Sequence, residues 1–291
     1  MCKNLTHFIA EVSSNHHQEL SRCIEFIKTA AEIGCDSVKF QLFKIDELFA
    51  PEILAKSEMH RKRKQWELPV EFIPALREAC SKYKIAFSCT PFYLKAVDEL
   101  APYVDFFKIA SYELLWDDLL IKCAKTNLPI VISTGMATME EVDHAVDTLR
   151  THGAVDITLL HCVSAYPTPY TECNLSVLGM YRQRYGNIKV GWSDHSVSPA
   201  VINRAVHKWD ADVIEFHIDL DEQGAEYKAG HCWLPYQMAP IIQQAKDKYV
   251  IDGISEKHVS ISEQNDRDWR ADPIDGLRPL NKIRANFKFK G

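Results

Sequence analysis

The sequence predicts an α/β protein of the (β/α)8, or TIM, barrel class with a short C-terminal extension. The first observation behind this prediction is that eight short apolar runs alternate with amphipathic segments over most of the chain. The second is that 291 residues, 46% of them hydrophobic, suffice for one barrel of about 250 residues with a large core. We therefore expect residues 1–250 to form the barrel and residues 251–291 to form an extension or arm.

The eight runs are strand candidates because they are rich in β-branched residues and most are continuously apolar. Such runs are typical of strands that are covered on both faces in a parallel sheet. In order along the chain, the candidates are Phe8–Val12, Ser37–Gln41, Ile85–Ser88, Phe106–Ala110, Ile130–Ser133, Ile157–His161, Ile188–Gly191 and Val213–His217.

The segments between the runs carry apolar residues at helical spacing. One of them begins after Thr138, a suitable N-cap, and has Glu141 in the position of a capping-box partner. The clearest helix candidates are Ser21–Ile33, Met139–Leu149, Ser198–Trp209 and Leu234–Tyr249.

Two segments depart from this alternation. Lys44–Glu67 is long and contains a basic stretch at residues 60–64, which indicates either a solvated helix face in an inserted loop or a lid over an anionic substrate. Ser255–Gly291 is highly charged and has turn signals at Asp272–Pro273 and Gly276–Pro279. This arm also carries apolar residues that need a surface to cover them, so we expect a homo-oligomer in which the arm packs on a neighbouring subunit; these residues are Trp269, Leu277, Leu280 and Phe287.

Composition excludes several classes of protein. Lys and Arg number 34 and Asp and Glu number 40, so the net charge of −6 speaks against a nucleic-acid partner. No apolar run approaches the roughly 18 residues that span a bilayer, and the N-terminus lacks the apolar region of a signal peptide. The nine cysteines are scattered without a CxxC pair, which favours a reducing, cytoplasmic location. Motifs of Rossmann, P-loop, zincin and α/β-hydrolase sites are absent from the sequence.

Two lysines, Lys39 and Lys108, lie inside apolar strand candidates. A lysine in such a place needs an anionic partner or a lowered pKa. Three interpretations remain open: a site for a phosphate or carboxylate among nearby Ser and Thr hydroxyls, a Schiff-base lysine, and a buried ion pair such as Lys39 with Glu11.

Two histidines, His195 and His217, lie at or just beyond the ends of neighbouring strand candidates. The carboxyl ends of barrel strands face the active site, so the two imidazoles are expected to share one cavity. Two imidazoles can hold a divalent transition metal with open positions for water or substrate. A carboxylate such as Glu226 or Glu11 could complete or orient that site.

Eight motifs occur at the strand ends in a fixed order, and together they resemble the sialic acid synthase family, the synthases of N-acetylneuraminate and related nonulosonates. The resemblance covers roughly residues 6–250. The motifs are Phe8-Ile-Ala-Glu11 with Asn15-His16, Val38-Lys-Phe-Gln41, Phe87-Ser-Cys-Thr-Pro-Phe92, Phe107-Lys-Ile-Ala-Ser111, Ile132-Ser-Thr-Gly-Met136, His161-Cys-Val-Ser-Ala-Tyr-Pro-Thr-Pro-Tyr170, Gly191-Trp-Ser-Asp-His195 and Ile214-Glu-Phe-His217.

This resemblance implies a TIM barrel that condenses phosphoenolpyruvate with an N-acetylmannosamine-like aldose, giving a nonulosonic acid and phosphate. It implies a divalent metal cofactor bound by His195 and His217, with Mn²⁺ preferred over Mg²⁺ or Co²⁺. The implied catalytic residues are Glu11, Lys39, Lys108 and Tyr166. The implied phosphoenolpyruvate site is Lys39, Thr90, Lys108, Ser111, Ser133, Ser164 and Ser193, and the implied sugar site is Gln41, Glu113, Tyr166 and Glu226. The alternatives are a catalytically inactive barrel that binds phosphoenolpyruvate or acts as a scaffold, and a Schiff-base pyruvate aldolase.

The sequence departs from the family pattern in four places. Ser13-Ser14 replaces a glycine, Ser164 replaces an asparagine, and Gly224–Tyr227 is a shortened loop in which Glu226 aligns with a sugar-binding aspartate. The family's C-terminal antifreeze-like domain, which gives the partner subunit an arginine, has no counterpart here. Candidates to replace that arginine are Arg267, Arg270, Arg278 and Arg284.

Overall fold

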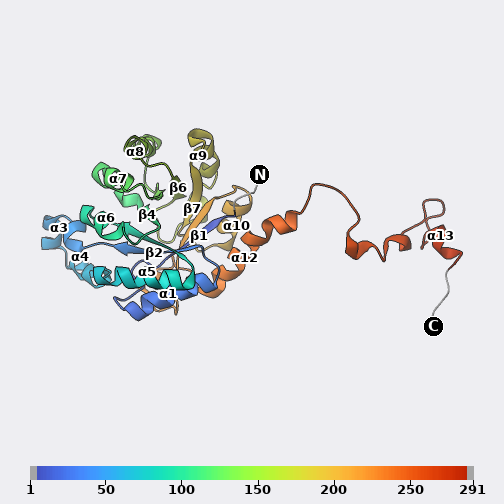
Figure 1. The fold of residues 1–291 in the computed structure, drawn as a ribbon, viewed down its shortest axis with the longest axis horizontal. Helices are drawn as coiled ribbons and strands as arrows, with labels where there is room; N and C mark the ends of the chain where they lie inside the picture. The colour runs from blue at the N-terminus through green and yellow to red at the C-terminus, as the bar shows by residue number, and fades with distance from the viewer. Residues whose placement is uncertain (1–4, 287–291) are drawn as a thin grey trace. The chain divides into compact units, whose positions relative to one another are not determined.

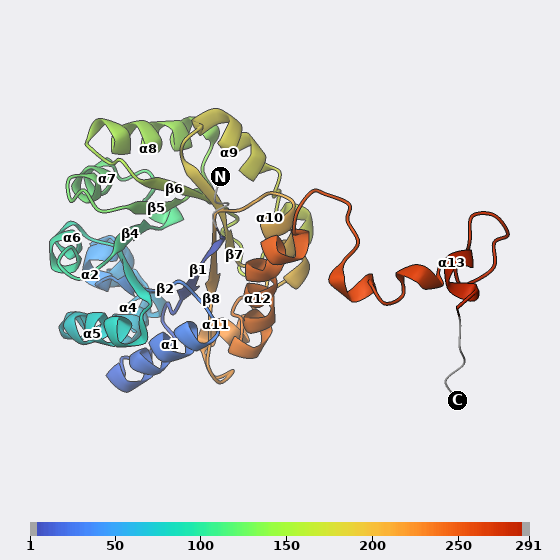
Figure 2. The same ribbon diagram turned by 45° about the vertical axis from the view of Figure 1, so that its right-hand side comes forward.

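The computed structural model describes residues 5–286, and it confirms the predicted (β/α)8 class. Eight parallel strands follow one another in chain order and close into a barrel, with the helices outside it (Figures 1 and 2). The chain divides into two compact units, Met1–Lys248 and Tyr249–Gly291. The barrel lies wholly in the first unit.

Every predicted strand is present. Two of them have the predicted bounds, and β3 and β7 continue beyond their predicted ends into polar residues. β8 closes the barrel by pairing with β1, which places Glu11 beside His217. The strands are β1 His7–Glu11, β2 Ser37–Leu42, β3 Ala86–Pro91, β4 Phe106–Ile109, β5 Ile130–Ser133, β6 Ile157–Cys162, β7 Lys189–Asp194 and β8 Val213–His217.

The helices surround the strands, and the predicted ones are present. The capping box of α8 is confirmed, because Thr138 Oγ1 accepts from the Glu141 amide at 3.3 Å and the Glu141 carboxylate accepts from the Thr138 amide at 2.7 Å. The longer helices are α1 Leu20–Glu32, α5 Ile73–Tyr83, α6 Leu94–Leu100, α7 Asp117–Ala124, α8 Met139–Thr151, α9 Val177–Tyr185, α10 Pro199–His207 and α12 Pro235–Asp252. Shorter ones are α2 Ile45–Leu48, α3 Pro51–Lys56, α4 Glu58–Lys62, α11 Ala225–Lys228 and α13 Asn281–Arg284. Within residues 5–286, no helix combines the length and apolar character needed to cross a membrane.

The interior of the barrel contains a small apolar layer separate from the main core between strands and helices. It consists of Ile9, Phe106, Val131, Leu160 and Val213, all buried. Side chains two residues apart on a strand point to the same side. The next inward-pointing residues are therefore polar or charged on most of these strands, namely Glu11, Lys108, Ser133 and Glu215, with Cys162 on β6. The apolar layer thus forms the floor of a polar cavity.

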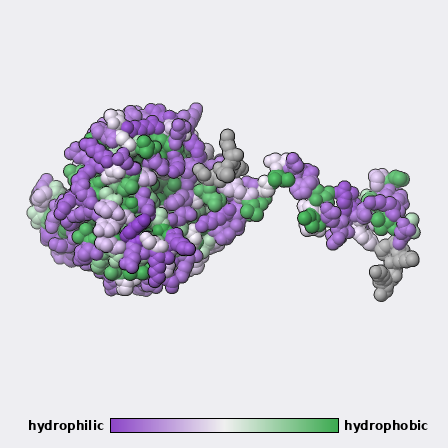
Figure 3. Space-filling view, in the orientation of Figure 1, coloured by the Kyte–Doolittle hydropathy of each residue, from purple (hydrophilic) through white to green (hydrophobic). Residues whose placement is uncertain are grey.

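The segment 44–67 folds into α2, α3, α4 and a 3₁₀ turn, and its basic residues are used locally. Lys62 pairs with Glu58 at 3.0 Å, and the Arg63 guanidinium lies over the rings of Phe49 and Trp66. These contacts of Lys62 and Arg63 agree with the solvated-face interpretation of the basic stretch. On the face of the barrel drawn in Figure 3, hydrophilic side chains are interspersed with smaller groups of hydrophobic ones.

The second unit has its own polar framework. Arg284 forms a two-point ion pair with Asp275, and Asp272 accepts from the backbone amides of Ile274 and Asn281. Trp269 and Leu277 are 48% and 62% exposed, and Phe287 lies outside the described residues. That the arm packs on a neighbouring subunit stays a prediction.

Candidate active site at the carboxyl ends of the strands

Two lysines and two glutamates form a buried charge cluster on the apolar floor. Lys39 forms an ion pair with Glu11 and lies 3.9 Å from Glu215, and Lys108 lies 3.7 Å from the same Glu215. None of the four side chains is more than 4% exposed. The ion pair between Lys39 and Glu11, one of the three interpretations of the sequence, is therefore present. Glu215, which contacts both lysines, received no role from the sequence.

The two lysines have opposite pKa shifts although both are buried. Burial lowers the pKa of Lys39, but the Glu11 and Glu215 carboxylates outweigh it and raise that pKa above its usual value. Burial also lowers the pKa of Lys108, and there Glu215 offsets only part of the effect while the charge of Lys39 adds to it. Lys108 is therefore the amine whose charge an incoming anion stabilises most.

Hydroxyl groups gather around Gly135, just after β5. A Cβ atom on Gly135 would lie 2.3 Å from Ser164 Oγ and 2.9 Å from Ser111 Oγ, so only glycine fits between them. The hydroxyl oxygens of Ser133 and Ser164 are buried and have no hydrogen-bond partner among the described residues. Buried hydroxyls without partners are rare in folded proteins, so this cradle is suited to a ligand that accepts hydrogen bonds.

The remaining residues of the predicted phosphoenolpyruvate site contact the charge cluster. Thr90 Oγ1 accepts a hydrogen bond from Lys39 Nζ at 3.2 Å. Ser193 Oγ donates to Glu215 Oε1 at 3.1 Å. The structure therefore brings the predicted site residues together at one end of the barrel.

Three of the residues predicted for the sugar lie above this cluster. Gln41 donates to Glu11 at 2.7 Å and to the Ser13 hydroxyl at 3.3 Å. Glu113 is buried with one carboxylate oxygen unpartnered among the described residues, and burial raises its pKa to about 7. Tyr166 is 41% exposed, and its ring lies 4.2 Å from the ring of His195, centroid to centroid.

The histidines predicted as metal ligands lie 5.3 Å apart, measured between ring centroids. His195 Nδ1 faces the Val163 carbonyl at 2.9 Å, and His217 Nδ1 faces the Glu226 carboxylate at 2.7 Å. Each ring therefore keeps Nε2 for a ligand, with the other nitrogen held by a second group as in known metal sites. Burial and the neighbouring His217 lower the pKa of His195 to about 3, so this imidazole is neutral and able to ligate at neutral pH. The donor set fits a divalent transition metal.

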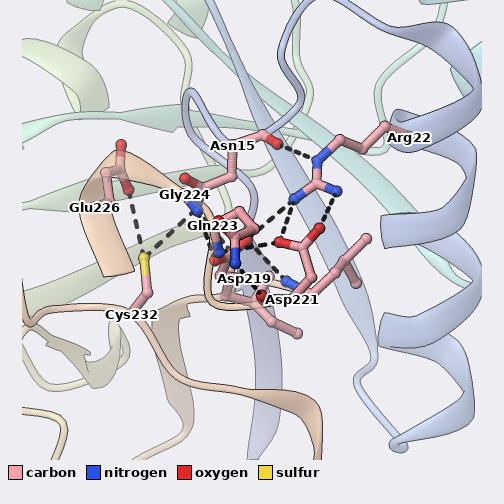
Figure 4. A network of polar contacts seen from close by, with 10 residues as sticks. Asn15, Arg22, Asp219, Asp221, Gln223, Gly224, Glu226 and Cys232 are labelled. Carbon is pink, nitrogen blue, oxygen red and sulfur yellow. Dashed lines mark hydrogen bonds and ion pairs between the residues drawn. The ribbon is translucent and has the colours of Figure 1, made fainter. Parts of the chain in front are cut away.

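A third histidine and a cysteine lie at the same place, and sequence reasoning missed both. Ile218 and Trp233 form a parallel bridge that returns the chain to the end of β8 and brings His231 and Cys232 beside Glu226. Asn15 contacts Cys232 from the β1 side (Figure 4). The only signal in the sequence is a His-Cys pair shortly after a strand that ends in histidine, and the loop geometry that makes it meaningful is not visible there.

An apolar cavity of about 450 Å³ adjoins the serine cradle. Three methionines, Met136, Met139 and Met180, line it, and Ser164 and His161 supply polar groups. Burial lowers the pKa of His161, so this histidine adds no charge to the cavity at neutral pH. The cavity is suited to an apolar substituent of a ligand that is bound at the cradle.

A closed parallel barrel with buried lysines, unpartnered hydroxyls and clustered histidines at the carboxyl ends of its strands has the layout of a TIM-barrel active site. A model of the NeuB family matches residues 26–257, and the chain belongs to this family.

Known relatives agree with this membership. The chain is 40% identical over 220 residues to an uncharacterised protein of Methanocaldococcus jannaschii, covering 75% of this chain and 63% of that protein. It is 35% identical over 276 residues to the N,N'-diacetyllegionaminic acid synthase of Campylobacter jejuni, covering 89% of this chain and 81% of that protein. The crystal structure of N-acetylneuraminic acid synthetase from Leptospira borgpetersenii has a TM-score of 0.77 at 27% identity, covering 91% of this chain and 90% of that one. The chain spans 61 to 63% of the length of the first three curated relatives.

Proposed function

We propose that this chain condenses phosphoenolpyruvate with an N-acetylmannosamine-like aldose to give a nonulosonic acid and phosphate. The observation that carries the proposal is that buried Lys108 lies in the same polar cavity as the buried, unpartnered hydroxyls of Ser133 and Ser164. A phosphate would supply acceptors for these hydroxyls and the negative charge that stabilises Lys108. Family membership, and relatives named as synthases of such acids, support the same reaction class.

In this proposal the carboxylate and phosphate of phosphoenolpyruvate bind on opposite sides of the charge cluster. Lys39 and Thr90 hold the carboxylate. Lys108 holds the phosphate together with Ser193 and the three serines of the cradle, which are Ser111, Ser133 and Ser164. Gln41, Glu113, Tyr166 and Glu226 surround the acceptor sugar. The cavity beside Ser164 would receive an apolar substituent of that sugar, such as an acyl group.

The proposed reaction forms one carbon–carbon bond, adds one water molecule and releases one phosphate. C3 of phosphoenolpyruvate attacks the aldehyde carbon, and water adds to C2. Glu11, which Gln41 orients through its 2.7 Å hydrogen bond, takes one proton of that water, and the former aldehyde oxygen takes up one proton as it becomes a hydroxyl. The C2–O bond to phosphate then breaks while the C2 hydroxyl becomes a carbonyl and its proton leaves with the phosphate, whose dianion Lys108 and the serines stabilise. A divalent ion on His195 and His217 would polarise the aldehyde oxygen.

The test is phosphate release from phosphoenolpyruvate with Mn²⁺, measured across a panel of acceptors with and without EDTA. The panel holds N-acetylmannosamine, diacetamido-trideoxy hexoses, arabinose 5-phosphate and erythrose 4-phosphate. We expect phosphate release when the acceptor is an acetamido sugar, and we expect EDTA to abolish that release. Saturable binding of phosphoenolpyruvate without release for any acceptor would favour the inactive barrel, and absence of binding would overturn the proposal.

A Schiff-base aldolase is the second candidate, because burial lowers the pKa of Lys108 and so favours its nucleophilic amine form. Borohydride treatment in the presence of pyruvate would trap such an adduct on Lys108. Trapping of this kind, with aldol activity retained in EDTA, would select the aldolase over the synthase.

The eight cysteines of the described residues are all free and buried, which supports a reducing compartment and hence a cytoplasmic enzyme. A homo-oligomer through the arm completes the proposal.

A further inference from the structure

The two histidines of the candidate metal site lie just beyond the last paired residues of their strands. β7 and β8 are neighbouring strands of the barrel, and their pairing ends at Asp194 and Phe216 (Figure 2). His195 and His217 each follow one residue later. A functional site needs its groups held within about 0.5 Å of the productive geometry. Contacts other than the pairing of β7 with β8 must therefore set the 5.3 Å between the two rings.

Asp194 carries a buried carboxylate that accepts four hydrogen bonds, and its side chain is 0% exposed. Oδ1 accepts from Trp192 Nε1 at 2.9 Å and from Ser196 Oγ at 2.6 Å. Oδ2 accepts from the Val197 amide at 3.1 Å and from Trp233 Nε1 at 2.9 Å. All four donors are neutral groups, so hydrogen bonds from uncharged partners compensate the burial of this carboxylate.

Trp233 differs from the other three donors because it lies far from Asp194 in the sequence, on the loop that returns to β8. Its ring is buried, and its backbone amide donates to the His217 carbonyl at 2.8 Å. Its backbone also forms the parallel bridge with Ile218. The hydrogen bond between Asp194 and Trp233 therefore connects the residue before His195 with the residue that is bonded to His217.

The carboxylate lies behind the site and not inside it. Ser193 points into the barrel, where it donates to Glu215, and side chains alternate along a strand, so Asp194 points away from the cavity. Both tryptophan donors belong to the main apolar core between strands and helices. Asp194 thus acts on the site through the backbone of the neighbouring His195 and through Trp233.

We propose that Asp194 is a positioning residue that holds His195 and His217 at the separation that a shared divalent cation requires. This rests on the proposed function, in which the two histidines hold the ion of the reaction. Replacing buried ionic groups by apolar ones of similar volume is often neutral or stabilising, so stability alone does not account for this carboxylate. Hydrogen bonds around metal ligands orient them, and losing such bonds weakens metal binding or activity by roughly 10- to 100-fold.

The experiment measures Mn²⁺ binding to the full chain through the electron paramagnetic resonance signal of free Mn²⁺, a readout that does not depend on turnover. Asp194→Asn replaces one accepting oxygen with a donating amide and should weaken Mn²⁺ binding by roughly 10- to 100-fold. His195→Gln should abolish the same binding, which identifies the Mn²⁺ that is held by the histidine pair.

Two tryptophan variants form a matched pair. Trp233→Phe and Trp192→Phe each remove one indole N–H from the same carboxylate, and both rings are buried. Both variants should lower the melting temperature to a similar extent. Trp233→Phe should also weaken Mn²⁺ binding by roughly 10-fold, whereas Trp192→Phe should leave it unchanged, because the Trp192 bond stays within β7. A merely structural carboxylate would change the melting temperatures and not the Mn²⁺ affinity.

Equal Mn²⁺ affinities of the wild-type chain, Asp194→Asn and Trp233→Phe would overturn the proposal. Equal weakening by both tryptophan variants would overturn it as well, because the link to β8 would then have no special effect. Circular dichroism shows which variants are folded, and the tryptophan pair decides the question if Asp194→Asn is not.

Failure of this proposal differs from failure of the proposed function. A wild-type chain that binds no Mn²⁺ through His195 would overturn both the positioning role of Asp194 and the role of the ion in the proposed reaction. The expected Mn²⁺ affinities without phosphate release for any acceptor would refute the synthase and support the positioning role. Phosphate release with unchanged Mn²⁺ affinity in Asp194→Asn and Trp233→Phe would do the reverse.

Discussion

Replacement of Glu215 by glutamine tests whether the charge cluster is electrostatically balanced by the protein. Glu215 lies 3.7 Å from Lys108 and 3.9 Å from Lys39, and it is 3% exposed. At an effective dielectric constant near 20, each of these pairs is worth roughly 4 kcal/mol. The glutamine is no longer a buried charge, which returns part of that energy. We therefore expect a net loss of about 3–5 kcal/mol, as for other buried pairs that lose one partner.

The assay is urea denaturation of Glu215→Gln and wild-type chain at neutral pH, in a buffer free of phosphate and other multivalent anions. A loss of this size should also lower the melting temperature by roughly 10 °C in a chain of this length. The matched control is Glu32→Gln, whose side chain is 62% exposed and pairs with Lys28 at 3.6 Å. It should change the free energy of unfolding by no more than about 0.5 kcal/mol.

Phosphoenolpyruvate supplies the second measurement. In Glu215→Gln the two lysines lack one counter-charge, so an anionic ligand should raise the melting temperature of the variant more than that of the wild-type chain. A variant as stable as the wild type, with an equal response to phosphoenolpyruvate, would show that the lysines are not both charged in the free protein. That result would refute the balanced-cluster reasoning.

Three further predictions follow from single residues. Burial raises the pKa of Glu113 from 4.5 to about 7, so the folded chain binds a proton that the unfolded chain has released; stability should fall by roughly 3 kcal/mol as pH rises through this window. Glu113→Gln should remove that slope in urea titrations at about pH 5 and about pH 8. Gly135→Ala pushes a Cβ into Ser164 and should weaken phosphoenolpyruvate binding by roughly 10- to 100-fold in calorimetry, and an unchanged affinity would contradict the cradle. Thr138→Ala removes the α8 cap and should cost about 1 kcal/mol in urea denaturation, with binding unaffected.

The strands were predictable because their residues form continuous apolar runs. The predicted strand ends were wrong where polar residues interrupt these runs. β7 continues through Trp192, Ser193 and Asp194 because these residues still pair with β8, although the predicted strand ended at Gly191, before the polar pair Ser193-Asp194. The same effect extends β3 through Cys89, Thr90 and Pro91. In a barrel the last residues of a strand face the cavity from within the sheet, so polarity there marks the site and not the end of the strand.

The candidate site was predictable where it lies on strands and not where it depends on a returning loop. Lys39, Lys108 and His217 are fixed by strand positions that the sequence reveals. His231 and Cys232 reach the site only because Trp233 bridges back to Ile218, a tertiary contact with no local signal. The position of Glu215 was partly predictable. The alternation of side chains from Val213 places Glu215 inside the barrel, but its two lysine partners depend on how the barrel closes.

The charge balance of the cluster leads to a last prediction about how its ligands cooperate. Lys39 and Lys108 offset Glu11 and Glu215, so the free cluster is close to neutral. Phosphoenolpyruvate would bring carboxylate and phosphate charges into this buried place, above an apolar floor that offers no compensation. In the proposed function a divalent cation at the histidines would supply the missing positive charge, and linkage would then require that each ligand strengthen the binding of the other. Calorimetric titration of phosphoenolpyruvate with and without Mn²⁺ or Co²⁺ should therefore show at least about a 5-fold gain in affinity, and equal affinities would mean that the anion is balanced by the lysines alone.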